Sequence, residues 1–289
     1  NICVEACWVR GTTIRLSFPS VTSTVGLIMA STLAEGKTII TNAAKEPEIV
    51  DLANFLNSMG AKIEGAGEEV IKITGVRKLQ GTEFSITPDR IAAGTLMAAA
   101  AITRGNLVIE NVFPHHVTTT IKKLKETGVK VSEFKNSIKV ESKNKSIRAI
   151  NIITNVYPGF PTDMQPIFMA LMAIAKGTSR IKETIFDGRF SHIPSLRKLG
   201  ALIRVDNCVA IVKGVKKLIG ARVKASDIRG GAAMTLAGLA AEGITEVTNI
   251  YEIDRGYYKL DELLLKSGAN IKRVVRQDLD LEIRHKPNV

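Results

Sequence analysis

The same pattern of apolar residues occurs four times along the chain. Four segments rich in Ala, Met and Leu each end in glycine: Ser20 to Gly36, Asp89 to Gly105, Thr162 to Gly177 and Asp227 to Gly243. These closing glycines lie 69, 72 and 66 residues apart. A second glycine follows 23 to 25 residues later in every case, at Gly60, Gly128, Gly200 and Gly268. Because both sets of glycines recur at the same interval, they indicate an internal repeat of about 70 residues.

Each repeat is predicted to run strand, helix, strand, helix, strand, strand. A β-prone run opens each one: Thr12 to Leu16, Glu83 to Thr87, Ile150 to Ile153 and Arg222 to Ala225. The small-residue helix follows, with a Ser, Thr or Asp of N-cap character before it and glycine after it. Alternating pairs such as Ala61 to Ile63 with Val70 to Ile73 complete the unit. Because the first helix is apolar nearly all round, it should be buried among its siblings.

The predicted fold class is therefore α/β (α+β), built from repeated βαβαββ units. If the first helices run parallel, their N-termini meet at one face, and each adds about half a positive charge and free N–H groups to it. Ser20, Asp89, Asp163 and Asp227 open these helices. The sequence thus predicts an anion-binding face that carries these four residues.

Composition narrows the class of ligand. The 289 residues suggest about two domains, and 45% apolar with 24% charged residues is ordinary for a globular protein. The apolar stretches carry charges too often for a membrane span. The net charge of +12 fits nucleic acid, a lysine-rich solvated surface or small anions. Scattered lysines and only 5% aromatic residues argue against nucleic acid, which leaves an anionic metabolite as the functional alternative.

Cysteine and histidine usage adds two expectations. The three cysteines are too few for a disulfide framework, which favours a reducing compartment and hence the cytoplasm. The four histidines, His115, His116, His192 and His285, show no ligand spacing with cysteines or carboxylates. We therefore expect no metal site.

Six short runs resemble the UDP-N-acetylglucosamine enolpyruvyl transferases: Asn42 to Asp51, Pro88 to Arg90, Phe160 to Gln165, Arg189 to His192, Asp227 to Arg229 and Ile253 to Tyr257. The likeness runs in order along essentially the whole chain. It implies an enolpyruvyl transferase-like inside-out α/β barrel of two domains, each with three repeats, four of the six being present here. Residues 1–87 would be the last repeat of a partial first domain, and 88–289 a second domain of three repeats. The helix from Ser20 to Gly36 would then lack its siblings and expose an apolar face.

The resemblance implies transfer of the enolpyruvyl (1-carboxyvinyl) group of phosphoenolpyruvate to the 3′-hydroxyl of UDP-N-acetylglucosamine, with release of phosphate and no cofactor. This is the first committed step of peptidoglycan synthesis. Its partners would be these two small molecules, with no nucleic acid or membrane, and the oligomeric state stays open. The resemblance also implies that about the N-terminal third of the enzyme is absent, so we expect this chain alone to be inactive. A non-catalytic remnant that binds anions and a sister enzyme with another acceptor are the alternatives.

Three residues are expected to carry the chemistry. By resemblance, Asp163 is the general base for the sugar hydroxyl, although from its position alone its carboxylate could simply cap a helix. Arg229 and Arg255 would hold the carboxylate and phosphate of phosphoenolpyruvate, because a guanidinium fork fits both groups. The alternative for both arginines is an exposed salt bridge, for Arg255 most directly with Asp254.

Five further positions are expected to bind substrate. The backbone N–H groups of Ser20 and Val21 match the family's diphosphate site at a helix N-terminus. Phe18 and Pro19 precede them where the family often has a basic residue, a departure that weakens this site. Ile185 matches a backbone position that touches the sugar nucleotide, and a core strand residue is the alternative.

Overall fold

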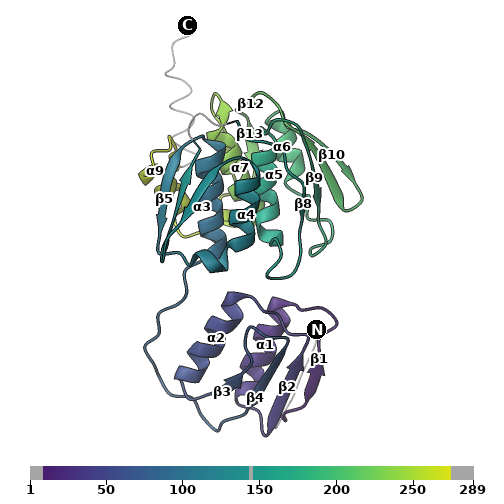
Figure 1. Cartoon of the computed structure of the whole chain (residues 1–289), viewed down its shortest axis with the longest axis vertical. Helices are drawn as coiled ribbons and strands as arrows, with labels where there is room; N and C mark the ends of the chain where they lie inside the picture. Colours follow the sequence, from purple (N-terminus) through teal and green to yellow (C-terminus); the bar gives the residue numbers. More distant parts are fainter. Residues whose placement is uncertain (1–8, 143–145, 275–289) are drawn as a thin grey trace. The chain divides into compact units, whose positions relative to one another are not determined.

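The computed structural model describes residues 9–142 and 146–274, and these form two compact units. The first unit contains residues 9–89 together with 154–162, and the second contains the remaining described residues (Figure 1). The sequence placed 88–289 in a single domain and did not anticipate that 154–162 would group with the first unit. A bridge between Thr154 and Phe160 closes this short segment on itself.

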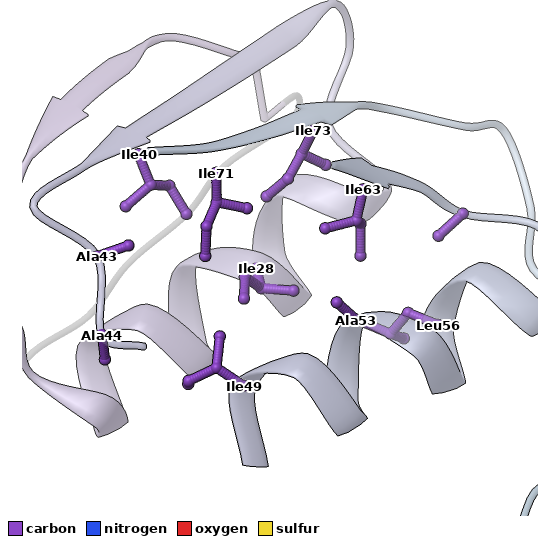
Figure 2. Close-up of a cluster of buried hydrophobic side chains, with 11 residues drawn as sticks. Ile28, Ile40, Ala43, Ala44, Ile49, Ala53, Leu56, Ile63, Ile71 and Ile73 are labelled. Atoms are coloured by element: carbon purple, nitrogen blue, oxygen red, sulfur yellow. The ribbon is translucent and has the colours of Figure 1, made fainter. Parts of the chain in front are cut away.

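Residues 9–89 of the first unit form one complete repeat. Its elements are β1 (Thr13–Arg15), α1 (Val21–Thr32), β2 (Lys37–Thr41), α2 (Pro47–Ser58), β3 (Lys62–Glu64) and β4 (Val70–Thr74). The strands form one sheet in the order β1-β2-β4-β3, with β1 parallel to β2 and the other pairs antiparallel. Both helices cover one face of this sheet, where Ile28 of α1, Ile49 of α2 and Ile71 of β4 meet in a buried cluster (Figure 2).

Helix α1 has an exposed apolar face, as the sequence predicts. It buries Thr24, Ile28, Ser31 and Thr32, whereas Met29 and Leu33 are 53% and 58% exposed within the described residues. Gly26, three residues before Met29 on the same helix, has no atom within 4 Å of a built Cβ. The prediction that a first helix is buried among siblings is thus wrong for α1, because the first unit contains only one helix of this type.

The second unit contains three repeats of the same kind. The first has α3 (Arg90–Ile102), β5 (Asn106–Glu110), a 3-10 turn η1 (Pro114–His116), α4 (Thr118–Glu126), β6 (Lys130–Glu133) and β7 (Ser137–Glu141). The next has β8 (Ile152–Ile153), η2 (Thr162–Met164), α5 (Gln165–Met172), β9 (Thr178–Lys182), α6 (Ile193–Lys198), β10 (Leu202–Asp206) and β11 (Val209–Lys213). The last has β12 (Leu218–Ile219), β13 (Arg222–Lys224), α7 (Ile228–Leu239), β14 (Ala241–Glu242), β15 (Glu246–Thr248), α8 (Tyr251–Asp254) and α9 (Leu260–Lys266).

Helices α3, α5 and α7 form the core of the second unit, with the strands outside them (Figure 1). The strands form sheets in the orders β5-β7-β6 and β10-β11-β9-β8, with the parallel pairs β12-β14 and β13-β15. Every residue of α5 is buried, as are ten residues of α3 and eight of α7. Small residues such as Ala98, Ala170 and Ala232 have no exposed surface, so the helix backbones approach closely. Mutual burial of the first helices, predicted from their composition, is confirmed here.

Two local predictions were wrong. The run Glu83 to Thr87 forms no strand, and Thr87 donates its backbone N–H to the Asp51 carboxylate at 3.3 Å in place of a neighbouring strand. The helix expected over Thr162 to Gly177 begins only after one 3-10 turn and ends at Met172. Seven of the eight repeat glycines adopt a positive φ, for example +91° at Gly36 and +114° at Gly177, which only glycine accepts easily. Gly105 is the exception, because Arg104 before it takes the left-handed conformation with φ of +54°.

Candidate functional site

Asp163 lies between two arginines in the second unit. Arg189 donates from Nη1 to Asp163 Oδ1 at 2.7 Å. Arg229 donates to Asp163 Oδ2 from Nε at 3.1 Å, and its Nη2 lies 2.9 Å from the same oxygen. The arginine side chains are only 15% and 13% exposed, while that of Asp163 is 34% exposed. We call these three side chains the Asp163 cluster.

Three chain segments from two repeats build this cluster. Asp163 lies in η2, directly before α5, and Arg189 follows β9 in a loop. Arg229 is the second residue of α7, whose N-cap Asp227 accepts the backbone N–H groups of Arg229 and Gly230 at 3.0 Å each. Since Asp163 and Arg229 are in contact, α5 and α7 begin at the same end of the core. For these two helices, the predicted convergence of N-termini is confirmed.

The charges of the cluster hold Asp163 ionised. Burial alone would raise the pKa of the Asp163 carboxyl, but the positive charges of Arg229 and Arg189 and their hydrogen bonds outweigh it and lower the pKa below its ordinary value. Two guanidiniums and one carboxylate leave one net positive charge in a partly buried place. Such a site attracts an additional anion, and a guanidinium can bind carboxylate or phosphate through paired hydrogen bonds.

His192 packs beside the cluster without joining it. Its side chain has no exposed surface, and its Nε2 lies 3.2 Å from the sulfur of Met169. Its Nδ1 has no hydrogen-bond partner among the residues that the structure describes. Burial lowers the pKa of His192 to about 4, with the Asp227 carboxylate opposing this and the Arg189 charge adding to it. At neutral pH His192 is therefore uncharged.

The helix-cap interpretation of Asp163 is wrong, because α5 has no side-chain cap and the carboxylate is engaged by arginines. The exposed-salt-bridge interpretation of Arg229 is also wrong, because its side chain is largely buried. Arg189 is the residue that sequence reasoning missed. It stands in one of the runs that carried the resemblance, but an arginine in a loop gives no signal of its own.

Arg255 does not join the cluster in the described part of the chain. It is 52% exposed, and its Nη1 donates to Glu252 Oε2 at 2.7 Å, one turn earlier on α8. The alternative considered for Arg255, an exposed salt bridge, is what the structure shows, but the partner is Glu252 and not Asp254, which Arg273 binds with two hydrogen bonds of 2.8 and 2.9 Å. The role of Arg255 in binding an anion stays a prediction.

The remaining candidate positions lie partly in the first unit, which is described by itself. Ser20 caps α1, its hydroxyl accepting the N–H of Ser23 at 3.3 Å, and Val21 is the first residue of that helix. Phe18 is 43% exposed. Pro19 lines a pocket of about 220 Å³ together with Lys45. Glu46 and Glu69 line the same pocket, so Lys45 gives it no net positive charge to replace the basic residue that Phe18 and Pro19 lack.

Ile185 belongs to the second unit and lies beyond the end of β9. It is half-buried, and its N–H donates to the carboxylate of Glu183 at 2.9 Å. The core-strand interpretation of Ile185 is therefore wrong, while its contact with a sugar nucleotide stays a prediction. Over 9–142 and 146–274, no three His, Cys, Asp or Glu side chains gather as a metal site would require. In the same ranges, no helix combines the length and apolar character needed to cross a bilayer.

Comparison with curated proteins finds relatives that are named as UDP-N-acetylglucosamine 1-carboxyvinyltransferases. The chain is 54% identical over 263 residues to UDP-N-acetylglucosamine 1-carboxyvinyltransferase 1 of Caldanaerobacter subterraneus subsp. tengcongensis, an alignment that covers 91% of this chain and 63% of the relative. It is 52% identical over 267 residues to UDP-N-acetylglucosamine 1-carboxyvinyltransferase 2 of Carboxydothermus hydrogenoformans, covering 92% and 64%. The chain thus spans less than two thirds of the length of these relatives.

Solved structures agree on the fold. The enolpyruvyl transferase NikO from Streptomyces tendae matches with a TM-score of 0.82 at 27% identity, over 93% of this chain and 66% of that one. EPSP synthase from Acinetobacter baumannii matches with a TM-score of 0.71 at 21% identity, over 93% and 64%. The family model described as EPSP synthase (3-phosphoshikimate 1-carboxyvinyltransferase) matches residues 1–264. The chain belongs to this family of carboxyvinyl transferases.

Proposed function

We propose that this chain carries part of the active site of a UDP-N-acetylglucosamine 1-carboxyvinyltransferase. The observation that carries the proposal is the Asp163 cluster, a carboxylate held between two arginines that leaves net positive charge beside a candidate base. Phosphoenolpyruvate has a carboxylate and a phosphate, and both groups suit the guanidiniums of Arg189 and Arg229.

The proposed reaction is an addition followed by an elimination. In the addition, the 3′-hydroxyl of the sugar attacks C2 of phosphoenolpyruvate while C3 takes up a proton. In the elimination, the tetrahedral adduct loses phosphate from C2 and a proton from C3, which restores the double bond. Asp163 accepts the hydroxyl proton, and the arginines stabilise the negative charge of the substrate and of the leaving phosphate. No cofactor takes part in these steps.

Substrate binding would also turn Asp163 into a stronger base. In the empty site both carboxylate oxygens are engaged by arginines, which lower the pKa of Asp163. An anionic substrate competes for the same guanidiniums and weakens these contacts. Burial, which opposes ionisation, then has the larger effect and raises the pKa. The base would thus become basic only when phosphoenolpyruvate is in place.

The acceptor is proposed from the relatives. Proteins at 54% and 52% identity are named for transfer to UDP-N-acetylglucosamine, whereas the enolpyruvyl transferase NikO is 27% identical. Ser20 and Val21 at the N-terminus of α1 supply backbone N–H groups for a diphosphate. These features favour the sugar nucleotide over another acceptor.

Incubation of the purified chain with phosphoenolpyruvate and either UDP-N-acetylglucosamine or 3-phosphoshikimate tests the proposal. Phosphate release is followed in solution, and mass spectrometry identifies any carboxyvinyl product. Because the chain spans less than two thirds of its relatives, we expect phosphoenolpyruvate binding with little or no turnover, and any product formed only on the sugar nucleotide. A product on 3-phosphoshikimate alone would refute the proposed acceptor.

A further inference from the structure

Tyr257 lies against the guanidinium of Arg229. The Arg229 Cζ is 5.0 Å from the centre of the Tyr257 ring, a distance at which a cation is attracted to the ring face. The Tyr257 side chain is buried, with only 3% of the residue exposed. Burial would lower the pKa of Arg229, but Tyr257 and Asp163 outweigh it and raise the pKa, so Tyr257 is an important neighbour of this cation.

A hydrogen bond from another repeat fixes the Tyr257 ring. Tyr257 Oη and Thr95 Oγ1 lie 2.9 Å apart, and Thr95 has no exposed surface. Thr95 Oγ1 also donates to the carbonyl of Ile91 at 2.9 Å, so its only proton is already used. Tyr257 must therefore donate its hydroxyl proton to Thr95. This bond joins α3 to the segment that follows α8.

The backbone before Tyr257 comes close to the start of α7. A Cβ on Gly256 would lie 2.5 Å from Ile228 Cγ2, a distance that no side chain accepts without movement. Ile228 is the residue directly before Arg229. The glycine thus lets the chain pass the first turn of α7, and Tyr257 follows with its ring beside Arg229.

We infer that Tyr257 is a positioning residue, which with its anchor Thr95 holds Arg229 in the orientation that meets Asp163 and an incoming anion. Asp163 binds Arg229 through Nε and Nη2, and the tyrosine ring lies near its central carbon. Hydrogen bonds alone would let the long Arg229 side chain change rotamer when an anion competes with Asp163 for its guanidinium. The functional meaning of this inference rests on the proposed anion-binding role of Arg229, whereas the test of the Arg229 orientation does not depend on that role.

Nuclear magnetic resonance of the arginine Nε–H groups tests the positioning directly. Arg229 Nε donates to Asp163 at 3.1 Å, so its proton should exchange slowly with water. Arg197 Nε donates to the carbonyl of Ile203 at 3.0 Å and serves as the internal reference. We expect Tyr257→Leu to speed Arg229 Nε–H exchange by about five- to thirtyfold, the range for a desolvated cation–ring contact, and to leave Arg197 unchanged.

Milder variants separate positioning from misfolding. Tyr257→Phe and Thr95→Val each keep the packing volume nearly constant and remove the hydrogen bond between the two residues, and Thr95→Val also removes the bond from Thr95 Oγ1 to the Ile91 carbonyl. We expect each to speed Arg229 exchange by a few fold, about two to ten, and the double variant to add little more, because both act on one bond. Tyr258→Phe, at an 83% exposed residue, is the control and should change nothing.

Binding of phosphoenolpyruvate, measured by calorimetry on the same variants, separates the two claims. Weaker binding in parallel with faster exchange supports both. Faster exchange with unchanged affinity leaves Tyr257 as a positioning residue and contradicts the anion-binding role of Arg229. Unchanged Arg229 exchange in folded Tyr257→Leu, Tyr257→Phe and Thr95→Val proteins would overturn the inference.

Discussion

The buried, neutral His192 should make the stability of the second unit depend on pH. Its ordinary pKa of 6.5 applies to the unfolded chain, whereas burial lowers the pKa in the folded state to about 4. Between these values the unfolded chain binds a proton that the folded chain does not. Acidification therefore favours unfolding, and stability falls as pH falls through this window.

The size of the effect follows from the two pKa values. Going from pH 7 to pH 5, His192 should lower the free energy of unfolding by about 2 kcal/mol, and the loss should approach about 3 kcal/mol near pH 4. Asp163 and Asp227, whose pKa values are lowered in the folded state, contribute stability that is lost only at still lower pH. The interval from pH 7 to 5 thus isolates the histidine.

Urea unfolding followed by circular dichroism at pH 7, 6 and 5 measures this loss. The two units are fitted as separate transitions. His192→Gln removes the titrating ring and should reduce the pH dependence of the second unit by about 2 kcal/mol, whatever its effect at pH 7. His115→Gln, at an exposed histidine, is the matched control. Equal pH dependence in wild type and His192→Gln would refute the reasoning.

Three further predictions concern other parts of the chain. Asp163→Asn should strengthen binding of inorganic phosphate by about tenfold, since it frees two arginines from a competing carboxylate, and calorimetry showing weaker binding would contradict this. Gly230→Ala should lower stability by about 0.5 to 2 kcal/mol, because its Cβ would lie 2.9 Å from Asp227 Oδ2 and displace the carboxylate that caps α7. Gly26→Ala, in open space on α1, should instead raise it by about 0.5 to 1 kcal/mol, and thermal melts compare the two. Limited proteolysis should cut first within residues 76–88, which have no helix or strand and include the 82% exposed Ile86, whereas early cuts inside α5 would contradict this.

The repeat and its buried helices could be predicted from the sequence because both depend on local pattern. An apolar helix flanked by an N-cap residue and a glycine has one physical solution, burial among similar helices. Where the structure differs from the prediction, a contact with another part of the chain determines the local conformation. The run Glu83 to Thr87 has strand-forming residues, but Asp51 is the group that binds its backbone. The exposed face of α1 followed from counting the helices available to cover it.

The candidate site was only partly predictable for a different reason. Asp163 and Arg229 stand at helix starts, where a pattern marks them, and the structure brings them together. Arg189 lies in a loop, and only its tertiary contact with Asp163 reveals its place. Arg255 carried the same expectation as Arg229, yet it pairs with Glu252 on its own helix. Motifs name residue types, whereas the partner of a long side chain depends on the folded neighbourhood.

Phosphoenolpyruvate binding by the purified chain tests the central claim, that Arg189 and Arg229 form an anion site around Asp163. Calorimetry would compare wild type with Arg189→Ala, Arg229→Ala and Arg204→Ala, the last removing an exposed arginine of β10. We predict that each cluster variant weakens binding by about tenfold or more, as expected when a charge-assisted hydrogen bond is lost, and that Arg204→Ala binds like wild type. Equal affinity in all four proteins would contradict the account.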